Sequence, residues 1–307
     1  MEHKKTLLVF NPAAGQQLIQ QNLFHVLDRF AKHGFVVTAY PTQQKKEAYE
    51  MICQYGPDYD YIVCAGGDGT LNEAVDAMMT LPRRPIFGYL PCGSTNDFAA
   101  TLELPLDLAE ATDAICTGSP LPIDIGAFQQ EHFSYVAAFG LFTDVSYGTS
   151  QNLKNMFGHA AYVLEGIKRL GNIRSYLCRI TRDGEVMEDK YIFGMVTNSA
   201  SVGGFTLPVQ NGSCRREGCF ELILLREIPG LLELQEVVAT LLGAAGPSEY
   251  FTVLPADRVT VECEEPLSWT RDGEFGGEHR KAEIEICHNA LEIMVPKNSK
   301  RLAEGQD

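Results

Sequence analysis

The sequence predicts an α/β domain with a parallel sheet, followed by a mainly antiparallel, sandwich-like β domain. Strand and helix patterns alternate in the first part of the chain, which favours a parallel sheet with helices on both faces. After about Pro122 the pattern changes to short strand-like runs separated by turn signals such as Asp183-Gly184. We therefore expect domains over residues 1–125 and 126–295, with the charged tail 296–307 loosely held or packed back on the first domain.

The elements of both domains can be assigned from apolar spacing. In the first domain we expect strands at residues 6–10, 35–40, 61–65 and 86–90. Helices are expected at residues 18–33, after Thr42, which can act as an N-cap, and from the end of the third strand to about Met79. In the second domain, helices are expected at 153–170 and 230–242, and strands at 133–140, 176–182, 190–197, 219–225, 258–263, 282–287 and 291–295.

The composition excludes several classes of protein. The net charge of −15 argues against general nucleic-acid binding. There is no signal peptide and no window of ~18 apolar residues, so we expect a cytoplasmic protein that is at most peripheral to the inner membrane face. The nine cysteines are odd in number and lack any Cys-x-x-Cys spacing, which favours buried, reduced thiols.

The most informative motif follows the third predicted strand and reads Gly66-Gly67-Asp68-Gly69-Thr70. Adjacent glycines let the backbone approach a ligand closely, and backbone N–H groups before a helix bind anions. A carboxylate at such a turn indicates Mg²⁺ or a hydroxyl to be deprotonated. This motif therefore predicts phosphate chemistry.

Two further polar turns follow strands of the same sheet. Asn11-Pro12-Ala13-Ala14-Gly15 follows the first strand and, alone, also suits an ordinary strand-to-helix turn, while Gly93 to Asp97 follows the fourth. Because ligands of parallel sheets gather at the carboxyl ends of strands, we expect the three turns to converge. The P-loop and the dinucleotide-binding glycine motif are both absent.

A possible general base lies far downstream, in Thr270-Arg271-Asp272-Gly273-Glu274. This segment also has the features of a plain hairpin turn. An acceptor hydroxyl needs a carboxylate or a histidine as base, and no histidine lies in a glycine-rich or carboxylate-rich context. Separately, residues 166–182 carry five basic residues and no acid, a pattern of either a solvated face or a contact with anionic lipid, through Lys168, Arg169 and Arg174.

Taken together, these motifs resemble the bacterial diacylglycerol kinase catalytic-domain family of lipid kinases, which includes sphingosine and ceramide kinases. The resemblance covers nearly the whole chain and includes Asp124-Ile125-Gly126, Gly203-Gly204-Phe205 and Asp272-Gly273-Glu274. It implies a first domain like those of NAD kinases and phosphofructokinases. The Asn72-Glu73 extension favours the lipid branch.

The resemblance also implies roles for individual residues. ATP would be held by Asn11, Pro12, Ala13, Ala14, Gly15, Thr42, Gly66, Gly67, Asp68, Gly69, Thr70, Leu71, Asn72, Glu73 and Thr95. Asp68, Asp97 and Asp124 would organise Mg²⁺, and Glu274 would activate the hydroxyl of diacylglycerol to give phosphatidate and ADP.

One part of the resemblance is imperfect. Relatives hold a structural Mg²⁺ in the second domain, at positions matching Cys214, Glu217 and Cys219. Glu217 replaces an Asp, and Arg215 and Arg216 beside it can compete with the metal. The sequence therefore does not decide whether this second site binds Mg²⁺. A sphingoid base, another lipid or a soluble metabolite as acceptor, and an inactive nucleotide- or lipid-binding regulator, remain alternatives. A homodimer is implied by resemblance alone.

Overall fold

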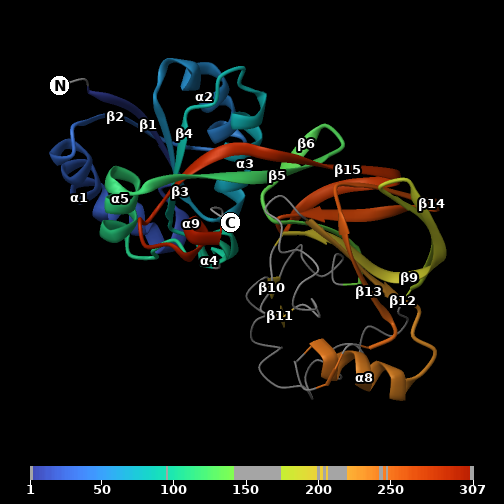
Figure 1. Ribbon diagram of the computed structural model, residues 1–307. Coiled ribbons are helices and arrows are strands. Elements are labelled where there is room, and N and C mark those ends of the chain that lie inside the picture. Colours follow the sequence, from blue (N-terminus) through green and yellow to red (C-terminus); the bar gives the residue numbers. More distant parts are fainter. Residues whose placement is uncertain are drawn as a thin grey trace. The chain divides into compact units, whose positions relative to one another are not determined.

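The computed structural model describes residues 3–94, 96–141, 174–198, 201–202, 205–206, 220–241, 245–246 and 248–304 (Figure 1). It divides into two compact units. Unit 1 comprises Met1–Ile125, Glu131–Ser134 and Cys287–Asp307, and unit 2 comprises Gly126–Gln130 and Tyr135–Ile286. The helix predicted at residues 153–170 lies outside the described residues.

Unit 1 is built on a parallel sheet. Its strands run in the order β2-β1-β3-β4, and the final part of β15 pairs with β4 in parallel at Ile293 and Phe87. The bounds are β1 (Lys4–Phe10), β2 (Phe35–Pro41), β3 (Tyr61–Gly66), β4 (Ile86–Pro91) and β15 (Glu274–Val295). Strand β5 (Ser119–Phe128) pairs with β15 and with the short β6 (Glu131–Phe133).

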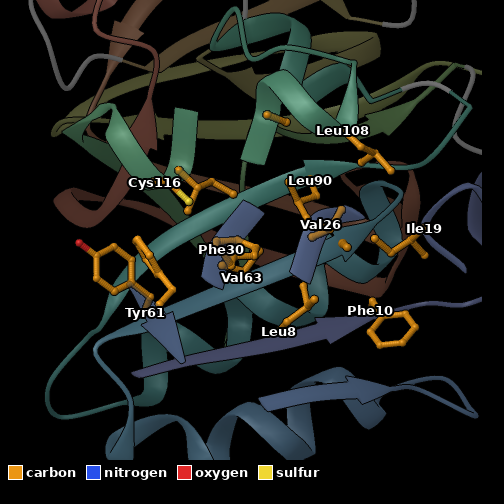
Figure 2. Packing of buried hydrophobic residues seen from close by; sticks show 14 of the residues in the cluster. Leu8, Phe10, Ile19, Val26, Phe30, Tyr61, Val63, Leu90, Leu108 and Cys116 are labelled. Carbon is orange, nitrogen blue, oxygen red and sulfur yellow. The ribbon is translucent and has the colours of Figure 1, made fainter. Parts of the chain in front are cut away.

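Helices cover both faces of this sheet. Helices α1 (Leu18–Lys32) and α5 (Leu108–Thr117) pack together on one face, and α2 (Glu47–Tyr55) and α3 (Asp68–Thr80) pack together on the other (Figure 1). On the α1 and α5 side, side chains of Leu8, Val63 and Leu90 meet those of Phe30 and Leu108 in a buried core (Figure 2). The helical spacing of apolar residues places Phe30 and Leu108 on the faces of α1 and α5 that are turned to the sheet.

The shorter elements of unit 1 complete its surface. They are η1 (Ala14–Gln17), η2 (Gly56–Asp58), α4 (Asp97–Thr101) and α9 (Lys300–Glu304). The tail docks through Arg301, which donates to the Thr101 carbonyl at 3.1 Å, and Lys300, which lies 3.4 Å from the Glu103 carboxylate. A basic tail is thereby held at the end of α4.

Unit 2 is an antiparallel sheet in the order β13-β12-β9-β7-β14-β15, with β8 paired to both β9 and β14. The core contains Trp269, whose ring lies 5.0 Å from that of Phe128 and 4.9 Å from that of Phe139. The bounds are β7 (Val136–Gly140), β8 (Tyr176–Arg182), β9 (Glu185–Thr197), β10 (Ser201–Val202), β11 (Phe205–Thr206), β12 (Phe220–Arg226), α8 (Leu231–Leu241), β13 (Phe251–Ala256) and β14 (Arg258–Arg271).

Two strands of unit 2 are longer than predicted. The separate runs at 282–287 and 291–295 belong to the single strand β15, and the run at 258–263 continues to Arg271 in β14. Exposed charged residues interrupt the apolar pattern of both strands: Glu278 stays paired in the ladder, and Glu264 lies where the register shifts between Glu262 and Leu267 while β14 continues. A polar residue on the solvent face is compatible with a strand, so composition alone underestimates the length.

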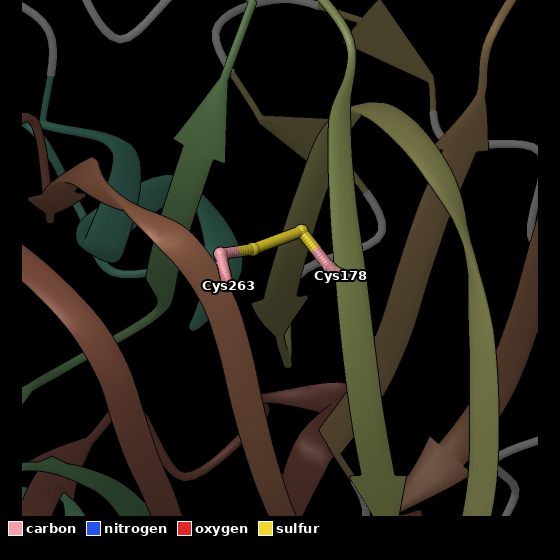
Figure 3. Close-up of a disulfide and its surroundings, with 2 residues drawn as sticks. All are labelled: Cys178 and Cys263. Carbon is pink, nitrogen blue, oxygen red and sulfur yellow. A yellow bond between two sulfur atoms is a disulfide. The ribbon is translucent and has the colours of Figure 1, made fainter.

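The expectation of reduced cysteines is wrong for one pair. Cys178 on β8 and Cys263 on β14 form a disulfide (Figure 3). They are direct partners in the antiparallel ladder, with Cα atoms 4.7 Å apart, and 85 residues separate them in sequence. Cys64, Cys92 and Cys116 are buried free thiols, and burial raises the pKa of Cys92 to about 12.

Candidate active site

The loops after the strands of unit 1 meet at one edge because the hydrogen bonding of the sheet continues past the strand ends. The Asn11 N–H donates to the Ala65 carbonyl at 2.9 Å, and the Thr42 N–H donates to the Phe10 carbonyl at 2.9 Å. The Cys92 N–H donates to the Gly66 carbonyl at 2.8 Å. The three predicted polar turns are therefore neighbours, as the parallel arrangement requires.

Glycines allow three of these loops to approach one another closely. A Cβ on Gly93 would lie 2.6 Å from the Gly67 Cα atom, and a Cβ on Gly15 would lie 1.8 Å from the Cys92 carbonyl oxygen. Gly15 also has a left-handed φ of 52°. At Gly15 and Gly93 the edge thus has no room for a side chain.

Helix α3 starts at this edge with donor groups directed out of its first turn. It begins at Asp68, its N-cap Gly67 is extended, and no side chain caps it. The first N–H groups of a helix have no partner within the helix, and they bind anions well. Asp68 adds a carboxylate whose Oδ1 atom is buried. This geometry suits a phosphate with an accompanying cation.

Two asparagines fix the shape of the turns. The Asn11 carboxamide oxygen accepts from the Ala13 N–H at 3.0 Å. The Asn96 side chain accepts from the Gly93 N–H and donates to the Gly93 carbonyl, both at 2.9 Å. The buried Tyr89 hydroxyl donates to the Gly66 carbonyl at 3.0 Å. Sequence reasoning gave Tyr89 no role, although a buried tyrosine hydroxyl requires a partner.

The Asn72-Glu73 extension ties α3 to its neighbours. The Glu73 carboxylate accepts from the Lys46 N–H at 2.8 Å, and the Asn72 side chain donates to the His132 carbonyl at 3.4 Å. The His132 ring lies 2.8 Å from the Asp76 carboxylate on the same helix. These side chains hold α3 in place.

Thr42 is not the N-cap that was predicted. Its hydroxyl lies 3.3 Å from the Phe10 carbonyl, and the N-cap of α2 is Lys46. The Glu47 carboxylate instead accepts from the Gln43 N–H at 2.5 Å and from the Tyr40 hydroxyl at 2.7 Å. These bonds lower the pKa of Glu47, the Gln43 N–H contributing most.

The three aspartates of the predicted magnesium network differ in what the structure shows. Asp124 accepts from the Asn289 N–H at 2.6 Å and lies 3.6 Å from the His288 ring. Asp97 starts α4, and its side chain, like the whole of Thr95, is outside the described part of the chain. Among the described side chains, no three His, Cys, Asp or Glu residues are grouped as metal ligands.

In unit 2 Glu274 follows a tightly held turn. Asp272 is only 4% exposed, and its Oδ1 atom accepts from the N–H groups of Tyr135 and Val136, each at 3.0 Å. The Asp272 N–H donates to the Val136 carbonyl at 2.9 Å. Glu274 and Arg271 are opposite each other in the register of the β14–β15 ladder, on the two sides of the hairpin. The segment is therefore a hairpin turn, as one reading predicted, and it presents an exposed Glu274.

Several predicted residues cannot be placed. Cys214, Glu217, Cys219, Lys168 and Arg169 lie outside the described residues. The third member of the basic patch, Arg174, is exposed, pairs with Glu265 and lies with its guanidinium 5.2 Å from the ring centre of Tyr176. This arginine thus has an acidic neighbour from a distant segment.

Comparison with known proteins identifies the family. A family model described as the diacylglycerol kinase catalytic domain matches residues 5–128. A diacylglycerol kinase of Staphylococcus carnosus (strain TM300) is 32% identical over 300 residues, which cover 97% of each chain. The chain belongs to the diacylglycerol kinase family. A diacylglycerol kinase of Bacillus subtilis (strain 168) is 30% identical over 296 residues, covering 96% of this chain and 97% of the relative.

Solved structures agree with this membership. A protein from Bacillus anthracis str. Sterne, provisionally described as a diacylglycerol kinase, superposes with a TM-score of 0.81 at 26% identity, covering 96% of each chain. The family resemblance drawn from the motifs is therefore confirmed. Diacylglycerol kinases are phosphotransferases with an alcohol acceptor and use ATP. None of the helices in the described part of the chain is long and apolar enough to cross a membrane.

Proposed function

We propose that this protein is an ATP-dependent lipid kinase that phosphorylates the hydroxyl of diacylglycerol to give phosphatidate and ADP, in phospholipid metabolism. The observation that carries the proposal is full-length similarity to diacylglycerol kinases, with the glycine turn of unit 1 at an uncapped helix start. Phosphoryl transfer depends on alignment and charge neutralisation more than on covalent chemistry, and main-chain N–H groups beside a carboxylate for Mg²⁺ would contribute to both.

In this proposal unit 1 binds ATP on an NAD-kinase-like, phosphofructokinase-like sheet, and unit 2 is a sandwich-like lipid domain. The first turn of α3 would bind phosphate oxygens through its N–H groups. The remaining nucleotide contacts would come from Asn11 to Gly15, Thr42, Gly66 to Glu73 and Thr95. The close approach of Gly15, Gly67 and Gly93 supports this, because side chains there would obstruct a ligand.

The residues at this edge fit Mg²⁺ in their donor chemistry. Mg²⁺ prefers oxygen ligands and is commonly held by one or two carboxylates together with water and substrate phosphates. Asp68 supplies such a carboxylate at the phosphate turn, and Asp97 and Asp124 would orient bound water. When bound, the ion would neutralise charge on the phosphates. Separately, Cys214, Glu217 and Cys219 would hold a second Mg²⁺ with a structural role in unit 2.

Glu274 would be the general base. Its carboxylate would take the proton of the acceptor hydroxyl as the oxygen forms a bond to the γ-phosphorus, and the bond from that phosphorus to the β-phosphate oxygen would break to release ADP. The exposed position of Glu274 beside an anchored turn supports this role. A base must be both accessible and held in place.

We also propose peripheral contact with anionic lipid from the cytoplasmic side through Lys168, Arg169 and Arg174, and a homodimer. The cluster of basic residues in an acidic chain supports the lipid contact. Binding to phosphatidylserine vesicles should weaken between low and high salt, since exposed charges are screened. Binding that salt leaves unchanged argues against this contact. Sedimentation of the full chain tests the dimer.

An acceptor screen tests the function and separates the alternatives. Full-length protein is incubated with ATP labelled at the γ-position and with diacylglycerol, a sphingoid base or soluble alcohols in turn. We expect label in phosphatidate and far less in other products. Preferred labelling of another acceptor would favour a different kinase, and ATP binding without turnover on any acceptor would favour an inactive regulator.

A further inference from the structure

The four loops at the phosphate edge of unit 1 differ in charge. They are residues 11–17, residues 42–46, the single linking residue Gly67 between β3 and α3, and residues 92–96. The basic residues in these loops are Lys45 and Lys46. The proposed nucleotide and metal residues near them include Asp68, Glu73 and Asp97, and no Lys or Arg. A polyphosphate bound there requires cations, and kinases generally combine a metal ion with lysine or arginine.

The loop that carries both lysines is fixed at its two ends. At its start, Thr42 is tied to the end of β1 by its N–H, 2.9 Å from the Phe10 carbonyl. At its end, the Lys46 N–H donates to the Glu73 carboxylate on α3 at 2.8 Å. The loop is therefore anchored to the turn of Asn11 and to the helix of Asp68, the two elements on which phosphate binding is proposed.

The backbone of the loop has a defined conformation although its lysine side chains are exposed. Lys46 has a left-handed φ of 69°, which is unusual for a residue with a Cβ atom. The Glu47 carboxylate accepts from Gln43 at 2.5 Å and from Gln44 at 3.2 Å, and Glu73 accepts from Lys46. Such conformations persist where surrounding bonds determine them and they occur often at ligand sites.

The anchoring point lies close to the phosphate turn along α3. Glu73 is five residues after Asp68, which corresponds to about 7.5 Å along the helix axis. The extended four-carbon stem of a lysine covers most of such a separation, and its ammonium group attracts phosphate oxygens as a point charge. Lys45 and Lys46 thus start from a backbone held beside the helix whose N–H groups form the proposed anion site.

We propose that Lys45 and Lys46 bind the phosphate tail of ATP and that Glu73 is a positioning residue that holds their loop. This inference rests on the proposed function, because it assumes ATP at this edge. It assigns the cationic part of the site to a loop outside the glycine motifs. It also gives the carboxylate of Glu73, one of the nucleotide residues proposed above, an indirect role: this carboxylate binds the protein backbone, while the lysines that it positions bind the nucleotide.

The first test compares nucleotides that differ only in their phosphates. Dissociation constants of ATP, ADP and AMP are measured by calorimetry for the full-length wild type, Lys45→Ala, Lys46→Ala and the double variant. We expect the double variant to bind ATP at least tenfold more weakly, ADP less so, and AMP as the wild type does. Lys46→Arg in the wild-type background should retain most of the ATP affinity, since the positive charge is retained.

Lys32→Ala is the matched control, because Lys32 is an exposed lysine of unit 1 whose partner is Asp28 on the same helix. It should bind all three nucleotides normally. If wild type binds ATP and the double variant binds it as Lys32→Ala does, the lysine inference is overturned. Equal losses for ATP and AMP also overturn it, since they indicate a collapsed loop. Wild type that binds no nucleotide contradicts the proposed function itself.

The second test isolates Glu73. Glu73→Ala should weaken ATP binding in the wild-type background. It should have little further effect in the Lys45→Ala, Lys46→Ala background, because losing Glu73 and losing the lysines both remove the same contact of the lysines with ATP. Glu73→Gln keeps an acceptor oxygen and should retain most of the affinity. Additive losses in this cycle would show that Glu73 acts independently of the lysines and would overturn its positioning role.

Discussion

The phosphate edge of unit 1 and the Asp-Gly-Glu turn of unit 2 hold their functional groups in opposite ways. At the edge, Gly67 and Gly93 allow two loops to touch, so the site depends on the absence of side chains. At the turn, the buried Asp272 carboxylate accepts from the N–H groups of Tyr135 and Val136 at the start of β7, so the site depends on one side chain being present. In the proposed function the first arrangement would leave main-chain donors for a polyphosphate, whereas the second would hold one exposed carboxylate in place.

The largest effect is expected at Glu274. Glu274→Gln should lower phosphoryl transfer by about 10²- to 10⁴-fold, because a general base is lost, and should leave ATP affinity unchanged. Steady-state transfer and calorimetric ATP binding measure the two quantities. Glu278→Gln, an exposed position on the same strand, is the control and should retain full activity. Substantial turnover by Glu274→Gln would exclude Glu274 as the base.

The next largest effect is expected at the contact between Gly67 and Gly93, where a substitution should weaken ATP binding. A Cβ in Gly93→Ala would lie 2.6 Å from the Gly67 Cα atom and 2.8 Å from the Asn96 carboxamide oxygen, so the two loops must separate. Overpacking of this kind costs about 1–3 kcal/mol of stability, and a binding loss of the same size would be roughly 5- to 150-fold in ATP affinity. Gly246→Ala is the control, because a Cβ there has nothing within 4 Å. Equal ATP affinity in the two variants would contradict the account.

A smaller effect should distinguish two similar turns of unit 2. Asp183 and Asp272 both precede a glycine, both have a left-handed φ, and both accept backbone N–H groups, Asp183 from Asp257 and Arg258. Asp183→Asn and Asp272→Asn should each lower the Tm, because charged acceptors contribute about 1.5–3 kcal/mol. Only Asp272→Asn should also reduce the transfer rate. We expect a reduction of roughly tenfold, which corresponds to a loss of ~1.4 kcal/mol in transition-state stabilisation. Equal transfer rates in both variants would show that the anchor of Glu274 is dispensable.

The smallest effect concerns pH and the loop of the lysines. Hydrogen bonds from the Gln43 N–H and the Tyr40 hydroxyl lower the pKa of Glu47 in the folded protein. The contribution of Glu47 to stability is therefore complete above the unfolded pKa of about 4.3, and it is lost as the pH falls through the lower folded pKa. The Tm difference between wild type and Glu47→Gln should therefore be present at neutral pH and vanish in strong acid. Glu50→Gln on the same helix serves as the control. A difference independent of pH would argue against the carboxylate bonds.

Local signals predicted unit 1 well and unit 2 less completely. The Gly66 to Thr70 turn follows a strand in sequence, so its place at the sheet edge could be inferred without tertiary contacts. The Asp272 anchor could not, because its partner Tyr135 lies 137 residues away. The Cys178–Cys263 disulfide was missed for the same reason, since strand pairing brings the two together. Thr42 failed as a cap because its hydroxyl is directed to the Phe10 carbonyl of a neighbouring strand.

The central claim is most directly tested by counting products. Full-length protein is given ATP labelled at the γ-position and diacylglycerol in mixed micelles, and phosphatidate and ADP are measured together. The account predicts one labelled phosphatidate for each ADP formed and little ADP without diacylglycerol. Release of ADP with the label in inorganic phosphate, or no ADP at all with intact ATP binding, would contradict it.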